Sequence, residues 1–312
     1  MQWPVIPQVY DSKKYLRHVQ SVIAQIANTI AAFEPVVMLA HPDHHNSARK
    51  LLSDTVELWD IPTDDLWCRD SGPLFAKDGN GALSIRNVNF NGWGNRFHLP
   101  NDIRIAERVS QRLGLPLFDS GVIGEAGGAE TSGHGLLMAN ESSWVNTNRN
   151  PGLNRDQIET RLLAAFGADR MIWGKGVKNM DITDDHIDGL ARFTGNNRVL
   201  MLLETAPWEQ DPYTLSARAL HRDLVKAGLE VETIPFAYDG RITDPMVMGS
   251  YVNYYVCNGA VIGSQMGDAK TDPIARAALS RHYPGREIIL LDTDALSELG
   301  GGIHCATQQM PA

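Results

Sequence analysis

The stretch Gly228-Leu-Glu-Val-Glu-Thr-Ile234 joins the end of a predicted helix to a hydrophobic strand. Glycine suits such a stop because it adopts positive φ without a Cβ clash. The same junction of a small residue and a strand recurs at intervals of roughly sixty residues. Five copies are present: Ser53 before 56–61, Gly114 before 115–118, Gly167 before 170–173, Gly228 before 229–234 and Gly285 before 287–291. A repeat of this kind decides the fold more strongly than any single element.

Further signals fill in each repeat. Capping carboxylates before proline, Asp211-Pro212 and Asp272-Pro273, predict helix starts, and Asn154 with Gln157 predicts a capping box. Apolar spacing predicts a long first helix over about 11–33. Strand-like runs lie at 36–40, 82–90, 199–203, 251–257 and 260–263. Each repeat is therefore expected to hold one helix and three or more strands.

Such repeats cannot bury a helix and a small sheet alone, whereas a closed ring shares one core and leaves no terminal edge. We predict an α/β fold, a five-repeat α/β propeller with a pseudo-fivefold axis and the active site on that axis. The length of 312 residues is compatible with one or two domains. No linker or charge block divides the chain, so we predict a single domain over 1–312.

The composition excludes several classes of function. The chain is 43% hydrophobic and 21% charged, as in ordinary globular proteins, and its net charge of −9 disfavours nucleic-acid and anionic-membrane binders. A small cationic ligand fits that sign. Three cysteines with no CxxC pair predict neither a disulfide framework nor a Cys-rich zinc site. The start carries no basic segment followed by an apolar run, and no apolar run spans a membrane, so we expect a cytoplasmic protein.

Four repeats carry a reactive residue at a similar depth. Asp70, Glu125, His186 and Cys305 each follow their repeat's stop within about twenty residues, whereas the fourth repeat offers no obvious catalyst there. In a ring these loops converge near the axis. In a cysteine peptidase, several carboxylates near the thiolate would destabilise the oxyanion of the transition state. Carboxylates instead bind a planar guanidinium substrate through its N–H pairs. Cys305 is then the nucleophile, and His186 protonates departing ammonia and later takes a proton from water.

Several motifs resemble the agmatine deiminase and bacterial peptidylarginine deiminase family of the guanidine-modifying pentein superfamily. They are Trp67-Cys-Arg-Asp-Ser-Gly-Pro73, Phe90-Asn-Gly-Trp-Gly94, Asn148-Arg-Asn-Pro151, the segment 181–188 and the segment 300–309. The resemblance implies a five-repeat propeller and a cofactor-free hydrolase acting on a linear amidine. It implies that a covalent thiouronium intermediate forms on cysteine, and that agmatine is converted to N-carbamoylputrescine on the way to putrescine and polyamines.

The resemblance also implies residue roles. Cys305 resembles the nucleophile, His186 the general acid/base, and Asp70 and Asp188 the carboxylates that clamp the guanidinium. Glu125 resembles the glutamate that orients the histidine or binds substrate, and Trp93 resembles a pocket aromatic that stacks on a planar cation. Two departures, Ala126 and Asp185, occupy positions where the family usually has glycine. They bear on substrate choice more than on chemistry.

Other interpretations stay open. The substrate could be arginine, peptidylarginine or another guanidine, or the amidino group could pass to an amine. For a carboxylate-bearing substrate the candidate partners are Arg69, Arg96, Arg149 and Arg192. A non-catalytic binding propeller is a third alternative for the function. For the assembly, a homo-oligomer is possible. His41, His44 and His45 do not have metal-ligand spacing, and Asp43 among them resembles a helix cap, so we predict no metal site.

Overall fold

In the computed structural model, which describes residues 1–6, 10, 12–204, 210–244, 247 and 249–312, the strands form one two-stranded and four three-stranded sheets. The two-stranded sheet holds β1 (Val36–Ala40) and β2 (Val56–Asp60). The others hold β3 (Leu74–Lys77), β4 (Leu83–Asn87) and β5 (Leu117–Asp119); β6 (Ala129–Thr131), β7 (Leu136–Asn140) and β8 (Arg170–Gly174); β9 (Ala191–Phe193), β10 (Arg198–Leu202) and β11 (Glu230–Ile234); and β12 (Tyr255–Cys257), β13 (Ala260–Ser264) and β14 (Glu287–Leu291).

One longer helix belongs to each sheet. It leaves one strand and returns the chain to a parallel neighbour, because parallel strands need a crossover. These helices are α2 (Pro42–Arg49), α5 (Ile105–Leu113), α7 (Arg155–Phe166), α8 (Pro212–Lys226) and α9 (Thr271–His282), and α1 (Lys13–Ala31) precedes the first sheet. Short helical turns fill the loops: α3 (Cys68–Ser71), α4 (Gly92–Asn95), α6 (Glu141–Trp144), α10 (Asp294–Ser297), η1 (Asp102–Arg104), η2 (Ala126–Gly128) and η3 (Ile187–Gly189).

The repeat predicted from the sequence is visible in the sheet topology. Each three-stranded sheet begins with an antiparallel pair and ends with the parallel strand that follows the helix, as in β3, β4 and β5. The expectation of three or more strands is wrong for the first sheet, where β1 pairs only with β2 and Gln2 adds a single bridge to Leu39. The predicted strand over 251–257 is also too long, since β12 begins at Tyr255.

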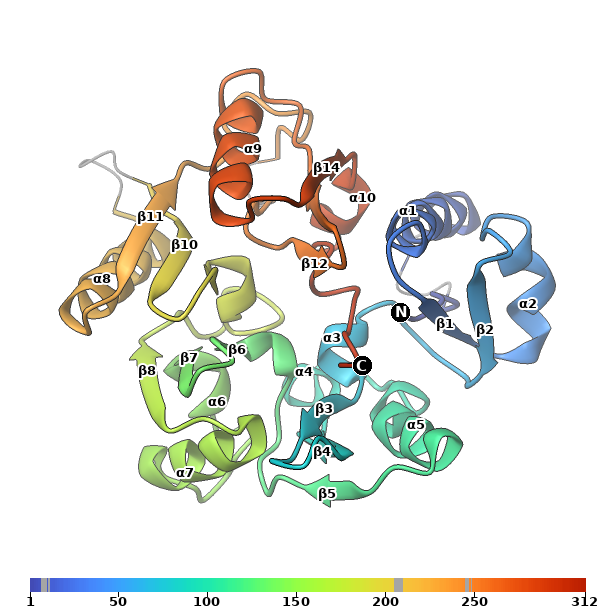
Figure 1. The fold of residues 1–312 in the computed structure, drawn as a ribbon, viewed down its shortest axis with the longest axis horizontal. Coiled ribbons are helices and arrows are strands. Elements are labelled where there is room, and N and C mark those ends of the chain that lie inside the picture. The colour runs from blue at the N-terminus through green and yellow to red at the C-terminus, as the bar shows by residue number, and fades with distance from the viewer. Residues whose placement is uncertain (7–9, 11, 205–209, 245–246, 248) are drawn as a thin grey trace.

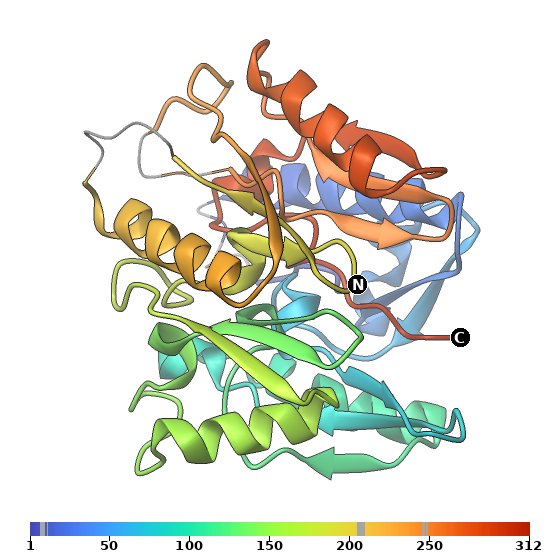
Figure 2. The ribbon, with the colours of Figure 1, turned by 60° about the vertical axis from the view of Figure 1, so that its left-hand side comes forward.

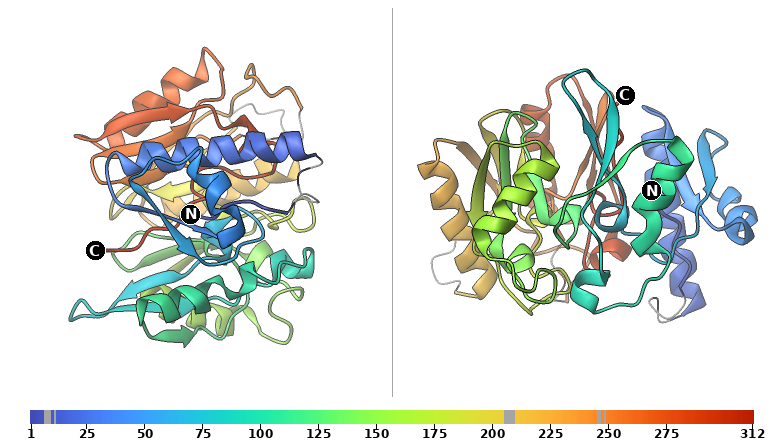
Figure 3. Two further views of the ribbon diagram at one scale, coloured as in Figure 1. Left: turned by 90° about the vertical axis from the view of Figure 1, so that its right-hand side faces the viewer. Right: turned by 90° about the horizontal axis from the view of Figure 1, so that it is seen from below.

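Figure 1 shows the five sheets in chain order around the centre of the molecule, with α2, α5, α7, α8 and α9 on the outside. Figure 2 shows α7, α8 and α9 covering the outer faces of their sheets. Figure 3 shows α1 beside the last sheet. Ile23 of α1 belongs to one hydrophobic core with Met38 of β1 and Ile262 of β13, so α1 joins the first and last parts of the chain. The C-terminal segment runs back to the centre, beside α3.

The predicted helix boundaries are mostly confirmed. Asp211 caps α8 through Thr214 N, Asn154 and Gln157 form the capping box of α7, and Gly114 and Gly167 end their helices in the left-handed conformation. The first helix is shorter than 11–33 at its C-terminal end, and residue 11 lies outside the described residues. Within the described part of the chain, no helix is long and apolar enough to cross a bilayer.

Two predicted caps are wrong. Asp272 lies inside α9, where its carboxylate accepts from Met266 N and Gly267 N, because the helix already begins at Thr271. Asp43 lies in the first turn of α2, and the cap is His41, whose Nδ1 accepts from Asp43 N at 3.2 Å. An imidazole nitrogen replaces the expected carboxylate there.

Candidate functional site

Loops from three sheets and the C-terminal segment carry the predicted site residues. Asp70 lies on α3, Glu125 directly precedes η2, and His186 directly precedes η3, which contains Asp188. These four side chains are at most 7% exposed, whereas Cys305, in the turn near the C-terminus, is half-buried. The Arg69 amide donates to the Cys305 carbonyl at 2.9 Å and so ties α3 to the C-terminal segment.

His186 lies between two carboxylates. Its Nε2 is 3.2 Å from Glu125 Oε2, and its Nδ1 is 3.7 Å from Asp70 Oδ1, beyond hydrogen-bond distance. Burial alone would lower the pKa of His186, but Asp70 and Glu125 outweigh it and raise the pKa to about 9. The ring is therefore an imidazolium at neutral pH, with a proton to deliver.

Trp93 determines how Asp70 is oriented. The indole Nε1 donates to Asp70 Oδ2 at 2.9 Å, and the ring packs against Phe90 and Phe97. Trp93 itself has φ of 54°, and Gly92 before it cannot be replaced, because a Cβ there would lie 2.2 Å from the Phe97 carbonyl oxygen. Burial, aided by the other site carboxylates, raises the pKa of Asp70 to about 6 despite His186 and Trp93.

Asp188 and Cys305 face each other. Cys305 Sγ lies 3.5 Å from Asp188 Oδ2, and His304 Nδ1 lies 2.6 Å from the same oxygen. Burial would raise the pKa of Asp188, but His304 lowers it to about 2, so Asp188 remains a carboxylate. Burial, Asp188 and Asp70 together raise the pKa of the Cys305 thiol well above its usual range. The uncharged thiol is the resting form.

Several buried side-chain polar atoms have no hydrogen-bond partner among the described residues, and three of them belong to this site: Asp70 Oδ1, His186 Nδ1 and Asp188 Oδ1. Gly127 packs closely against the same three side chains. A Cβ there would lie 2.6 Å from Asp70 Oδ1, 3.1 Å from His186 Nδ1 and 3.2 Å from Asp188 Oδ2, so only glycine fits. Buried polar groups are normally paired, and the two unpaired carboxylate oxygens can accept hydrogen bonds from a small polar cation.

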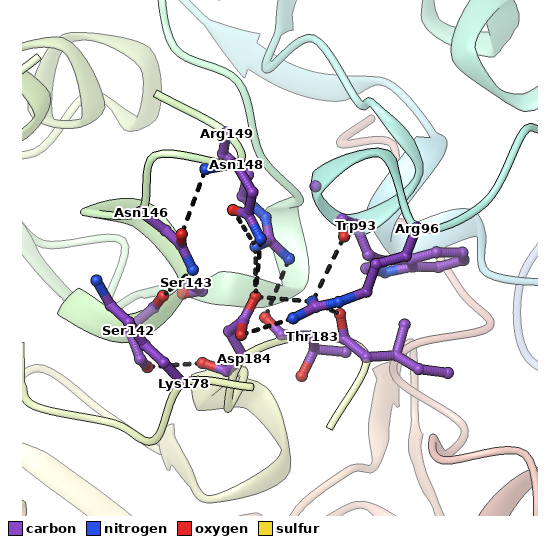
Figure 4. A network of polar contacts seen from close by, with 12 residues as sticks. Trp93, Arg96, Ser142, Ser143, Asn146, Asn148, Arg149, Lys178, Thr183 and Asp184 are labelled. Carbon is purple, nitrogen blue, oxygen red and sulfur yellow. Dashed lines mark hydrogen bonds and ion pairs between the residues drawn. The ribbon is translucent and has the colours of Figure 1, made fainter. Parts of the chain in front are cut away.

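Arg149 binds the carboxylate of Asp184 (Figure 4). It is fully buried, and its Nε donates to Glu125 Oε2 at 2.8 Å while its Nη1 donates to Asp184 Oδ2 at 2.7 Å. Arg96, beside Trp93, also binds Asp184, at 2.8 Å. These two guanidinium groups lower the pKa of Asp184, although burial acts in the opposite direction. Glu125 is thus held between a fixed cation and His186.

The carboxylates, the histidine and the thiol that the sequence interpretation grouped lie together in the structure, but the interpretation did not place three of their neighbours there. Asn253, His304 and Arg149 each contact a predicted site residue, and each is at most 4% exposed. Asn253 had a usable signal, since it is a polar residue within the apolar run 251–257. Arg149 lies within the quoted Asn148-Arg-Asn-Pro151 motif, and His304 directly precedes the nucleophile candidate.

Comparison with known proteins agrees with this geometry. The family of Porphyromonas-type peptidyl-arginine deiminases matches residues 1–311. The chain belongs to this family. A putative agmatine deiminase of Streptomyces coelicolor is 31% identical over 100% of this chain and 95% of its own length. An agmatine deiminase of Stutzerimonas stutzeri is 32% identical over 99% of this chain and 92% of its own.

Solved structures of similar proteins share the fold. A substrate-bound agmatine deiminase of C. jejuni is 26% identical, with a TM-score of 0.88, over 98% of this chain and 91% of the other. An agmatine deiminase of Enterococcus faecalis is 22% identical, with a TM-score of 0.91, over 100% of this chain and 92% of the other. This member of the Porphyromonas-type peptidyl-arginine deiminase family therefore has the α/β architecture of agmatine deiminases along its whole length.

Proposed function

We propose that the protein hydrolyses a guanidinium group to a ureido group with release of ammonia, and that its substrate is agmatine, giving N-carbamoylputrescine. The observation that carries the proposal is the group of buried atoms without a partner among the described residues, Asp70 Oδ1, Asp188 Oδ1 and His186 Nδ1, whose side chains all lie beside Gly127. A planar guanidinium presents N–H pairs that two carboxylates bind bidentately. The half-buried Cys305 sulfur then faces its central carbon.

The reaction balances without a cofactor. The Cys305 thiolate forms an S–C bond with the guanidinium carbon and gives a neutral tetrahedral adduct. His186 transfers its proton to one amino group, the C–N bond breaks and ammonia leaves, so a cationic thiouronium remains on the sulfur. Water attacks the same carbon and loses a proton to His186. The S–C bond then breaks, which regenerates the thiolate, and the hydroxyl proton of the departing ureido product passes through solvent to the ammonia released earlier, which becomes ammonium.

The electrostatics of the site suit this sequence of steps. His186 is protonated at neutral pH because its pKa is raised to about 9, mainly by Asp70 against the effect of burial. The thiol pKa of Cys305 is high because burial, Asp188 and Asp70 oppose the thiolate. A bound guanidinium offsets part of the charge of the two carboxylates and weakens that opposition, so the thiol loses its proton to solvent more readily. The substrate therefore promotes ionisation of its own nucleophile.

The four arginines considered for a substrate carboxylate are already engaged. Arg69 donates to Gln309 Oε1, Arg149 pairs with Glu125 and Asp184, Arg192 pairs with Glu130, and Arg96 pairs with Asp184. Three of them are at most 8% exposed. This favours agmatine, which has no carboxylate, over arginine, peptidylarginine or amidino transfer. The complete set of site residues favours an enzyme over a binding propeller.

The remaining assignments belong to the same proposal. The five sheets form a closed pseudo-fivefold propeller, residues 1–312 act as a single domain, and the site lies on the axis. Cys305 is the nucleophile, His186 the acid/base, Glu125 the group that orients His186, and Asp70 and Asp188 the clamp. Trp93 holds Asp70 and stacks on the cation. All three cysteines are free, which supports a reducing cytoplasmic setting, and the net charge of −9 argues against nucleic acid as a partner.

The test is an assay of ureido product and ammonia with agmatine, arginine and an arginyl peptide side by side. Cys305→Ser is the blank, and Cys257→Ser, which alters a buried thiol outside the site, is the matched control. We expect agmatine turnover that Cys305→Ser abolishes and Cys257→Ser keeps. Turnover of arginine in preference to agmatine would contradict the substrate assignment. Activity in folded Cys305→Ser would contradict the proposed mechanism.

A further inference from the structure

Asn253 brings the fourth repeat into the site. It lies between β11 and β12, in the repeat where the sequence offered no reactive side chain, and is 3% exposed. Its backbone carbonyl accepts from His304 N at 3.2 Å. A Cβ on Gly302 would lie 2.5 Å from Asn253 Oδ1, so glycine leaves room for this amide against the C-terminal segment. The two chain segments are fitted to each other around one side chain.

The contacts of Asn253 fix the direction of its amide. Cys305 N donates to Asn253 Oδ1 at 3.2 Å, and only the carbonyl end of the amide can accept that proton. The amino end must then face Cys305 Sγ, which lies 3.1 Å from Nδ2. The second Nδ2 proton is directed at the Asp188 carbonyl oxygen at 3.4 Å. One side chain thus binds the backbone and the sulfur of Cys305 together.

The surroundings of the Cys305 sulfur disfavour the thiolate, so a hydrogen-bond donor to the sulfur matters there. Its nearest charged neighbour is Asp188, 3.5 Å away, which opposes formation of the thiolate. Burial raises the pKa of Cys305, as do Asp188 and Asp70, whereas the Gly302 backbone and the Asn253 side-chain amide lower it. An N–H donor is the polar group that favours the thiolate over the thiol without adding a charge that would repel a cationic substrate.

We propose that Asn253 is a catalytic residue: its Nδ2–H donates to the Cys305 thiolate, favours its formation and aims the sulfur at the guanidinium carbon. When the S–C bond forms, the sulfur loses its charge and this hydrogen bond weakens. When the S–C bond breaks, the re-formed thiolate accepts a hydrogen bond from the Asn253 amide, which is already in place. The kinetic consequence rests on the proposed hydrolysis, but the effect on the thiol does not.

The experiment measures the thiol and the turnover separately. The rate of Cys305 alkylation by iodoacetamide is followed against pH by mass spectrometry of the Cys305 peptide, without substrate, in wild type, Asn253→Ala and Asn253→Asp. Asn253→Asp keeps the shape and the acceptor but replaces the donor with an oxygen. Asn28→Ala is the control, because Asn28 also bridges two backbone groups, Leu51 O and Ser53 N, far from the site.

We expect the alkylation profile of both Asn253 variants to move to higher pH by roughly one unit or more, the size of a hydrogen bond to a charged group. With agmatine, kcat should fall on the order of tenfold or more while KM changes little. Asn28→Ala should show neither effect. If Asn253→Ala does not fold, Asn253→Asp decides the question.

An unshifted alkylation profile in either folded Asn253 variant would overturn the inference. A kcat within twofold of wild type in folded Asn253→Ala would overturn its catalytic part. If wild type alkylates as expected, and the variants shift, but no guanidine is turned over, the proposed function fails while the role of Asn253 at the thiol stands. The two failures are therefore distinguishable.

Discussion

His304 Nδ1 lies 2.6 Å from Asp188 Oδ2, and this contact decides which oxygen of Asp188 is left for a ligand. Oδ1 is buried and without a partner among the described residues. Burial lowers the pKa of His304, and the nearby Arg192 and Arg69 lower it further, so the ring is neutral. A neutral donor orients Asp188 without cancelling its charge, and the full charge remains for the guanidinium that we propose it binds.

Loss of His304 should therefore weaken substrate binding. His304→Ala leaves Asp188 Oδ2 without its donor, and we expect kcat/KM for agmatine to fall roughly 10- to 100-fold, chiefly through KM, with His304→Gln partly restoring it. The pKa of Asp188 should rise, so the loss should be greater at pH 5 than at pH 8. His282→Ala is the matched control, since His282 also pairs with a carboxylate, Glu232, outside the site. An equal loss in both variants would contradict the assignment.

The pH profile of kcat/KM should be bell-shaped, with limbs that belong to two neighbouring groups. Burial raises the pKa of Asp70 to about 6, so below that pH the clamp loses a charge. The pKa of His186 is about 9, so above it the proton for ammonia is lost. Asp188 keeps its charge throughout, because its pKa is about 2. In Asp70→Asn the acidic limb near 6 should disappear and agmatine binding should weaken. Persistence of that limb would assign it to another group.

Arg149 should matter more for stability than any exposed arginine. Arg149→Ala would leave Glu125 buried without its cation and Asp184 with Arg96 alone, which costs on the order of 3 to 5 kcal/mol. Arg149→Lys should recover little, because one ammonium cannot reach both carboxylates with the geometry of the guanidinium. Urea unfolding measures the loss, with Arg104→Ala as the control, because Arg104 pairs with Glu107 at the exposed surface. Equal midpoints for the two alanine variants would refute the prediction.

The sequence predicted those features of the site that follow from the repeated order of helix and strand. Asp70, Glu125, His186 and Cys305 follow helix–strand junctions by similar distances, and a repeated topology places such positions together without any knowledge of side-chain packing. The capping signals of α7 and α8 succeeded for a related reason, because a cap depends on residues three positions apart. Local and repeated patterns are visible in one sequence.

Contacts between distant segments were not predictable in this way. Asn253 reaches Cys305 across 52 residues, and His304 reaches Asp188 across 116. Their partners are set by how the fourth repeat and the C-terminal segment pack, which no spacing rule encodes. Asp272 was mispredicted for a local reason: its carboxylate binds the loop amides of Met266 and Gly267, just before it in the sequence, and the helix already begins at Thr271.

Asp185 should reduce the stability of the protein at neutral pH. It has φ of 69°, and burial, reinforced by Asp181, raises its pKa to about 7. Since this folded-state pKa exceeds the unfolded value of about 3.8, the carboxylate destabilises the fold increasingly as pH rises from about 4 to 7. Asp185→Asn removes the charge and keeps a residue that tolerates positive φ. Urea unfolding should show the variant more stable by on the order of 1 kcal/mol at pH 8, with no difference at pH 4. Asp54→Asn, at an exposed position, should show no such pH dependence. A gain that is the same at both pH values would mean that backbone or packing effects, rather than the buried charge, set the stability at this position.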